Sequence, residues 1–403
     1  MTNLKTAYAP PSWLIGLSTG TAVMGITLIT PALPLIRAEM GVSANAVQFL
    51  FTGYLLMLAA SQLVIGPFSD LYGRRPFILA GAVMIAFGGI ITILSDSITS
   101  LTLGRVLQGV GAGACISMAR AMINDAFERQ EAAKKMATVQ SIQAIVPIIA
   151  LMTGGAVVAQ FGWVGVMWMI FGAGLTLVIF LPFLLRETFF DIKPSFSPKA
   201  VGRAYLHVLK IPLFLWFAIV SGTQVGMFFA MNGFLPYRYA ALGVSTLEFG
   251  FWFGLTPVAY FLGNLANRFF VVNLGIERAV LIGCILCSLS LIALFATQYL
   301  GVTSVLGIVL PCCLFGFSNG LTIANTVIGG IKSAGQYAGT GSGVIGALQM
   351  IAGSLLGSII ILLGGDRDII VACTVVLIAG LISLGMAIVI YRHTQKQGLH
   401  KEA

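Results

Sequence analysis

The stretch that decides the fold is Gly66-Pro67-Phe68-Ser69-Asp70-Leu71-Tyr72-Gly73-Arg74-Arg75-Pro76. It separates two long apolar segments and is the only strongly charged break within the first ninety residues. The two glycines allow tight turns, and Pro76 suits the first turn of a new helix, where its missing N–H costs nothing. Asp70, Arg74 and Arg75 therefore form a compact charged loop. We expect this loop at a membrane–water boundary, with its arginines toward the cytoplasm.

The composition indicates a polytopic membrane protein. Of the 403 residues, 58% are hydrophobic and 9% are charged, and the mean hydropathy is +0.99. A soluble protein carries about 25% charged residues, so water is not the main solvent of this chain. The net charge of +9 does not indicate nucleic-acid binding, because the basic residues lie in short loops and the tail. The six cysteines lie in apolar segments without metal-site spacing, so we expect no metal, and we expect no signal peptide.

A membrane-spanning helix needs about 20 apolar residues, and this length predicts twelve spans. They cover roughly 13–36, 45–66, 76–95, 99–122, 136–160, 163–185, 211–234, 248–272, 278–297, 302–326, 338–363 and 369–391. With the N-terminus inside, seventeen Lys and Arg residues lie on the cytoplasmic side and three lie outside. This asymmetry predicts that both termini are cytoplasmic.

The longest loop, about residues 186–210, divides the chain into two sets of six helices. We therefore predict an all-α protein with an N-terminal six-helix bundle (1–190), a cytoplasmic linker (191–210) and a C-terminal six-helix bundle (211–403). In transporters built from two such halves, the substrate site lies near the bilayer midplane between them.

Several motifs carry a resemblance to a known family. The stretch at 66–76 resembles the loop between helices 2 and 3 of the major facilitator superfamily, which reads roughly G-x-x-x-D-x-x-G-R-R. Arg105-Val-Leu-Gln108-Gly109-Val-Gly111 resembles the R-x-x-Q-G-x-G motif of the drug:proton antiporter branch. Pro31-Ala-Leu-Pro34 and the glycine-rich stretch 339–349 resemble the bicyclomycin-resistance type (Bcr/CflA) exporters. The resemblance implies the two-bundle fold of this superfamily, with a central cavity.

Two of these motifs depart from the family pattern. Pro31 and Pro34 predict a kink in the first helix, but the acidic residue that relatives carry one turn earlier is absent here. Pro147 with Gly154 and Gly155 is similar to the antiporter motif of helix 5, although a second proline near Leu151 is missing.

The resemblance also implies a gate on the cytoplasmic side, a latch that closes the inner mouth of the transporter. Its predicted members are Gly66, Asp70, Gly73, Arg74, Arg75, Arg120 and Asp125. The alternative interpretation is a static ion pair at the surface.

The predicted cavity contains one arginine and several amides. A charge inside an apolar span is costly, so Arg105 either contacts substrate and modulates proton affinity or is a buried anchor bonded to carbonyls. Each amide is equally consistent with helix packing and with ligand contact. The predicted cavity and coupling residues are Arg105, Gln108, Tyr54, Gln140, Gln143, Gln224, Asn232, Asn319 and Gln349.

The acidic residues all lie near the ends of the predicted spans. A cation site needs a buried negative charge, so we expect a neutral, zwitterionic or anionic substrate. Proton coupling follows from the resemblance. Without an acid in the first helix, either Asp70, Asp125 or the substrate itself would carry the proton.

These observations predict a secondary transporter for proton-coupled efflux of small drug-like or metabolite molecules. The alternatives are a dedicated metabolite or siderophore exporter, an uptake symporter or facilitator, and, from another class, a transport-inactive membrane sensor. The sequence contains no nucleophile–base constellation and no phosphate loop, so it does not indicate an enzyme. We expect no cofactor, a proton gradient as energy source, small-molecule substrate and lipid as partners, no nucleic acid, and a monomer in the bacterial cytoplasmic (inner) membrane.

Overall fold

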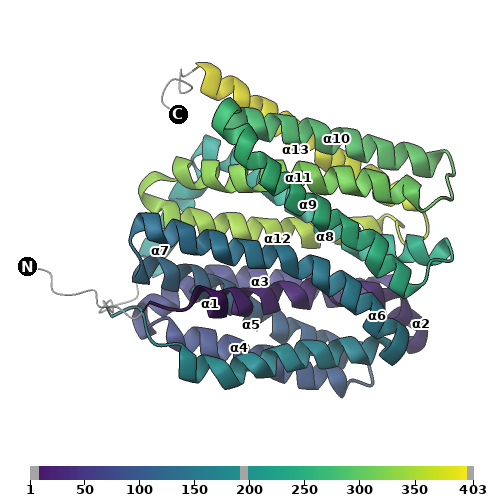
Figure 1. The fold of residues 1–403 in the computed structure, drawn as a ribbon, viewed down its shortest axis with the longest axis horizontal. Helices are drawn as coiled ribbons and strands as arrows, with labels where there is room; N and C mark the ends of the chain where they lie inside the picture. Colours follow the sequence, from purple (N-terminus) through teal and green to yellow (C-terminus); the bar gives the residue numbers. More distant parts are fainter. Residues whose placement is uncertain (1–8, 191–197, 397–403) are drawn as a thin grey trace, which may run out of the picture. The chain divides into compact units, whose positions relative to one another are not determined.

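The structure is a computed structural model that describes residues 9–190 and 198–396. Helices account for nearly all of this part of the chain, and no strand occurs in it. The predicted all-α class is therefore confirmed. Figure 1 shows the helices as a set of long rods joined by short connections.

The first half of the chain forms six long helical segments. The first predicted span is interrupted, because α1 ends at Thr27 and is followed by a 3-10 turn that contains Pro31. The range α6 contains the fifth and sixth spans as two helices that meet at a kink at Gly162, whose φ of 67° is not helical. The elements are α1 (Ser12–Thr27), η1 (Thr30–Ala32), α2 (Leu33–Met40), α3 (Ala44–Tyr72), α4 (Arg75–Ile93), α5 (Ile98–Ala126) and α6 (Arg129–Leu184).

The second half begins with a short helix that the spans do not include. It comprises α7 (Pro198–Leu209), α8 (Pro212–Ala241), α9 (Thr246–Leu274), α10 (Ile276–Tyr299), α11 (Leu306–Ser333), η2 (Gly335–Tyr337), α12 (Ala338–Leu362) and α13 (Ile369–Lys396).

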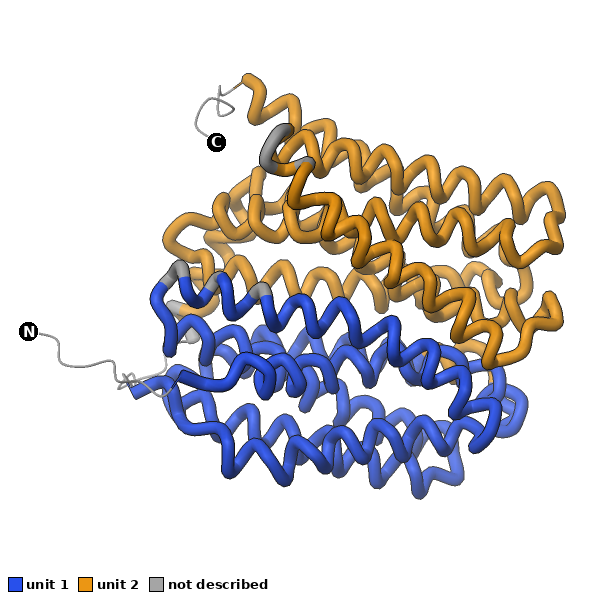
Figure 2. Tube along the Cα trace, viewed as in Figure 1, with its two compact units in different colours: residues 1–42, 49–198 blue, residues 43–48, 199–403 orange. Residues whose placement is uncertain are grey.

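The chain divides into two compact units (Figure 2). Unit 1 comprises Met1–Val42 and Phe49–Pro198, and unit 2 comprises Ser43–Gln48 and Lys199–Ala403. The same helix pairs pack in both: α4 packs on α5 as α10 packs on α11, and α1 packs on α6 as α8 packs on α12. Repeated packing of this kind is typical of transporters built from internal structural repeats.

Small residues let helices approach closely inside unit 1. A Cβ atom at Gly109 would overlap the carbonyl oxygen of Tyr54, and one at Gly113 would overlap that of Leu58. The hydroxyl of Ser61 then reaches the carbonyl of Val110 over 2.7 Å. This spacing of glycines brings the backbones of α3 and α5 together, as small residues do in membrane helices.

The outward surface of the helices is apolar. Ten described helices are long and apolar enough to cross a membrane, and one of them, Lys134–Leu184, covers two of the predicted spans. Large apolar side chains such as Trp168, Leu289 and Leu381 are exposed along these helices. Lipid is the solvent in which such a surface is stable, because the backbone polar groups are satisfied within the helices.

Candidate functional site

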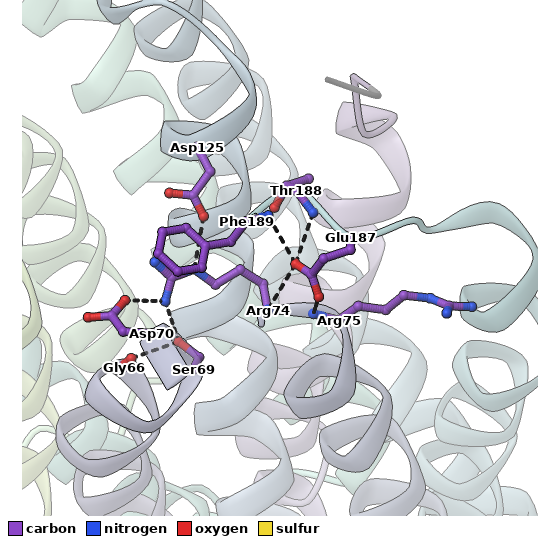
Figure 3. A network of polar contacts seen from close by, with 9 residues as sticks. All are labelled: Gly66, Ser69, Asp70, Arg74, Arg75, Asp125, Glu187, Thr188 and Phe189. Carbon is purple, nitrogen blue, oxygen red and sulfur yellow. Dashed lines mark hydrogen bonds and ion pairs between the residues drawn. The ribbon is translucent and has the colours of Figure 1, made fainter. Parts of the chain in front are cut away.

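The charged loop of residues 66–76 is organised around Arg74. The Nη1 atom of its guanidinium forms an ion pair with Asp70 at 2.6 Å and donates a hydrogen bond to Ser69, and Nε donates to Asp125 Oδ2 over 2.8 Å. The ring of Phe189 lies 4.3 Å from the guanidinium carbon (Figure 3). Arg74 is only 7% exposed, so its charge is almost fully surrounded by protein groups.

Two opposing effects act on the Arg74 guanidinium. Burial is the larger single effect and lowers the pKa of Arg74, but the hydrogen bonds and charges of Asp125 and Asp70 together outweigh it. The net result is a pKa above the ordinary value for arginine. Arg74 therefore stays charged throughout the physiological pH range, and its positive charge is a fixed part of this site.

A carboxylate that the sequence analysis missed completes the arrangement. Glu187 follows the end of α6, and its Oε1 and Oε2 accept hydrogen bonds from the backbone N–H groups of Arg74 and Arg75 at 2.9 and 3.0 Å. Oε1 also accepts from the backbone of Thr188 and Phe189 (Figure 3). Glu187 therefore caps the positive end of α4, where the first N–H groups have no helical partner. The signal in the sequence was an acid directly after the last span of the first half.

The two loop glycines have different roles. Gly73 has a φ of 87°, and a Cβ there would collide with the Glu187 carboxylate. Glycine is required at this position both by the backbone and by the close approach of Glu187. Gly66 lies within α3, and a Cβ on it would meet nothing within 4 Å. Its carbonyl accepts a hydrogen bond from the hydroxyl of Ser69 at 2.7 Å.

Arg74 and Arg75 also contact different parts of unit 1. Arg75 donates from Nε to the carbonyl of Leu185 and from Nη2 to that of Pro182, both at 2.8 Å. These carbonyls end α6, where a cation is favourable.

We call Ser69, Asp70, Arg74, Asp125, Glu187 and Phe189 the loop cluster. All its members belong to unit 1, so the contacts tie the ends of α3, α4, α5 and α6 to one another.

The structure does not bring Arg120 into the loop cluster. Arg120 and Asp125 are five residues apart on α5, which places them about 140° apart around the helix. Arg74, not Arg120, is the partner of Asp125, and no described ion pair or hydrogen bond involves the Arg120 side chain. A role of Arg120 in the gate stays a prediction.

A second polar site lies inside the bundle around Arg105. Arg105 is fully buried, and it donates from Nη1 to Gln108 Oε1 at 2.8 Å and from Nη2 to the carbonyl of Gly25 at 2.7 Å. The ring of Tyr54 lies 4.3 Å from the guanidinium carbon, and the Tyr54 hydroxyl donates to the carbonyl of Ala22. Groups from α1, α3 and α5, namely Gly25, Tyr54 and Gln108, therefore surround one cation.

The interruption of α1 accounts for the position of the Arg105 charge. Gly25 lies in the last turn of α1, which ends at Thr27. The final carbonyls of a helix lack intrahelical partners and carry its negative dipole end. The broken first helix thus presents acceptors, in place of a carboxylate, to the buried guanidinium. The predicted helix-5 motif packs at the same place, because a Cβ at Gly154 would approach the carbonyl of Leu28 and the ring of Pro31.

Two hydrogen-bond donors remain unused at this site. Arg105 Nε and Gln108 Nε2 are buried and have no partner among the described residues. An unsatisfied buried donor costs about 1–3 kcal/mol. The site therefore favours an additional acceptor, such as a carboxylate, carbonyl or water oxygen.

The remaining predicted cavity residues fall into two groups. Gln140 is exposed and Gln143 half-buried on α6. In unit 2, Gln224 donates to Ser383 at 3.1 Å, Asn319 to the carbonyl of Gln224 at 3.3 Å, and Gln349 to Ser221 at 2.8 Å.

Asn232 donates to the carbonyl of Phe228, one turn earlier on α8. These unit 2 contacts join helices or one helix to itself, as amides commonly do in membranes. A role in ligand binding stays a prediction for each of these residues.

Comparison with known proteins identifies the family. Residues 15–358 match the family described as the Major Facilitator Superfamily. The YdgK protein of Bacillus subtilis, described as an uncharacterised MFS-type transporter, is 27% identical over 87% of this chain and 88% of its own. The bicyclomycin resistance protein homolog of Haemophilus influenzae is 25% identical, covering 83% of this chain and 85% of that one. Multidrug resistance protein D of Escherichia coli is 26% identical, with 83% and 84% covered.

Solved structures agree with the fold. A D-xylose–proton symporter matches with a TM-score of 0.72 at 14% identity, covering 94% of this chain and 97% of that one. The nucleoside transporter NupG matches with a TM-score of 0.73, also at 14% identity, over 94% and 98% of the two chains. The predicted resemblance is confirmed: this chain belongs to the Major Facilitator Superfamily.

Proposed function

We propose that this protein is a proton-coupled secondary transporter that exports small molecules from the bacterial cytoplasm by alternating access. The names of its relatives, among them a bicyclomycin resistance protein homolog and multidrug resistance protein D, support export of drug-like compounds. The proposed location is the inner membrane, with both termini in the cytoplasm, and the proposed active form is a monomer without a cofactor.

The observation that carries the proposal is the buried Arg105. A guanidinium in an apolar bundle is costly unless all its donors are paired, and here the Nε donor is free. A charge kept at such a cost indicates a functional role. A substrate carboxylate, carbonyl or hydroxyl oxygen can accept from Nε without displacing Gln108 or Gly25. This argument favours a neutral, zwitterionic or anionic substrate over a lipophilic cation.

Coupling in this proposal uses the same guanidinium. Substrate that accepts from Nε adds a contact to a group already bonded to the end of α1, so a conformation that keeps Arg105 in this place binds substrate more tightly than one that does not. A ligand shifts an equilibrium only by its differential affinity for the two states. The loop cluster then has to form and break in each cycle, which limits its net contribution to a few kcal/mol.

The experiment uses purified protein in liposomes that contain a pH-sensitive dye. After a pH gradient is imposed, neutral, anionic and cationic compounds are added, with Arg105→Ala measured in parallel. Substrate-dependent proton movement that is lost in the variant supports coupled transport. Transport without proton movement would favour a second candidate, an uptake facilitator, for which the missing acid in the first helix is the supporting observation.

A further inference from the structure

The short helix α7 (Pro198–Leu209) has two different faces. Val208 is fully buried, and Val201, Ala204 and Tyr205 are partly buried at helical spacing. Burial also raises the pKa of the Tyr205 phenol. Positions i, i+3, i+4 and i+7 lie on one face of a helix, so this face is the side that packs against the protein.

The opposite face of α7 combines basic residues with exposed leucines. Lys199, Arg203 and Lys210, the last just beyond the helix, are exposed. Leu206 is 60% exposed and Leu209 is 39% exposed. At about 100° per residue, Lys199, Arg203, Leu206 and Lys210 fall within a sector of about 60°. In the part of the chain that the structure describes, no acidic side chain pairs with any of the three basic residues.

The surroundings of α7 fix its depth relative to the membrane. α8, a candidate membrane span, begins at Pro212, directly after Lys210 and Ile211. The ring of His207 also lies 4.8 Å from that of Tyr337, in the turn η2 between the spans α11 and α12. Both connections hold α7 at the level where helices of unit 2 leave the bilayer.

We propose that α7 is a binding site for anionic phospholipid, with Leu206 and Leu209 among the acyl chains and Lys199, Arg203 and Lys210 on the headgroups. Long basic side chains at a membrane interface extend their charges to the headgroups, while an apolar side chain between them enters the acyl region. The leucines favour a lipid over a soluble anion, because a soluble anion would leave them in water. The surface is that of the leaflet which the proposed orientation makes cytoplasmic, and the inference does not depend on the transported substrate.

The first test measures the depth of α7 in the full-length protein. An environment-sensitive fluorophore is attached in the variant L206C, on a Cys313→Ser background, because the other five native cysteines are buried. We expect a blue-shifted emission in phosphatidylcholine vesicles that contain phosphatidylglycerol, with quenching by brominated acyl chains. An emission typical of water in these vesicles would overturn the proposal. It would indicate a face open to solution or to a protein partner.

The second test measures lipid selectivity. The variant K199Q/R203Q/K210Q is compared with R278Q/R392Q/K396Q, which removes the same charge from exposed residues of unit 2 outside α7. Each basic residue near an anionic surface contributes about a five-fold preference, so the affinity for a fluorescent phosphatidylglycerol should fall by about 100-fold in the first variant and by less than about five-fold in the second. Equal losses would show a net-charge effect only, and competition by soluble glycerol phosphate would show a phosphate site. Either result would overturn the proposal.

Discussion

Arg105 donates a hydrogen bond to the carbonyl oxygen of Gly25, 2.7 Å away, at the last turn of a helix that stops within the bundle. The two residues are 80 positions apart in the sequence. The relationship links the charge on α5 to the break in α1, because a continuous helix would use that carbonyl for its own hydrogen bonding. Any change that straightens α1 or removes the guanidinium should therefore affect the other partner.

Arg105→Lys is expected to preserve the fold and to impair transport. Lysine keeps the positive charge but lacks the planar fork that reaches Gln108 and Gly25 together. Loss of one charged hydrogen bond costs about 1.5–3 kcal/mol, so the initial rate of substrate-driven proton movement should fall by about 10- to 100-fold. The measurement is the dye response in liposomes at matched protein density.

Arg238→Lys is the matched control for Arg105→Lys. Arg238 also donates to a glutamine, Gln298 Oε1, over 2.8 Å, but it is half-buried in the last turn of α8. This variant should retain most of the transport rate. Equal loss in both variants would mean that the effect is a general one of replacing arginine, and the role assigned to Arg105 would be wrong.

Gly73→Ala and Gly66→Ala should differ sharply, although both glycines belong to one motif. At Gly73 the positive φ and the collision with Glu187 act together, and the left-handed backbone alone costs about 1–2 kcal/mol for alanine. At Gly66 the helix is open around the new methyl group, so alanine should be neutral or stabilise by about 0.5–1 kcal/mol. Thermal unfolding in detergent measures both, and a reversed order would contradict the geometry of the loop.

The predicted architecture followed from the sequence because each of its signals is local. Span length, hydropathy and the charged loop depend on neighbouring residues, and the structure contains helices at each predicted span. Gly162, whose backbone is not helical, separates the fifth from the sixth span, as the two predicted ranges do. The helix α7 lies within the stretch predicted as a linker loop, and span length gives no signal for a helix of 12 residues.

The partners of the charged residues could not be predicted in the same way. Asp125 and Glu187 reach Arg74 from segments 51 and 113 residues away, and such pairings depend on tertiary packing. Arg120 and Asp125 are close in sequence, but the helix turns by about 140° between them, so sequence proximity does not show which of the two faces Arg74. Gln108 is part of the sequence motif around Arg105, but the other acceptor is the backbone carbonyl of Gly25, which leaves no residue-type signal.

Glu187→Gln should destabilise the protein even though it retains the shape of the side chain. The carboxylate accepts four backbone hydrogen bonds, and an amide has one oxygen and a donor group that cannot accept. Loss of the charge at the start of α4 and of at least one hydrogen bond should cost about 2 kcal/mol. The melting temperature in detergent checks this. Glu128→Gln removes an exposed acid at the N-cap of α6 that makes no side-chain hydrogen bond to the helix, so it should lower the melting temperature by less. A similar decrease in both would contradict the capping role.

Arg74→Gln should lower stability by an amount that does not change with pH between about pH 6 and about pH 10. Because its pKa in the folded state is raised above the unfolded value, the contribution of Arg74 is fully present below the unfolded pKa and is lost only as the pH rises through the folded one. Both values lie above this range, since arginine has a pKa above about 12. Removing one partner of a buried ion pair costs about 3–5 kcal/mol, and the partial exposure of Asp70 and Asp125 reduces this to about 2 kcal/mol. The test is the difference in melting temperature between wild type and variant across the pH series. A difference that shrinks toward alkaline pH would show that the Arg74 charge is not the fixed centre of the loop cluster.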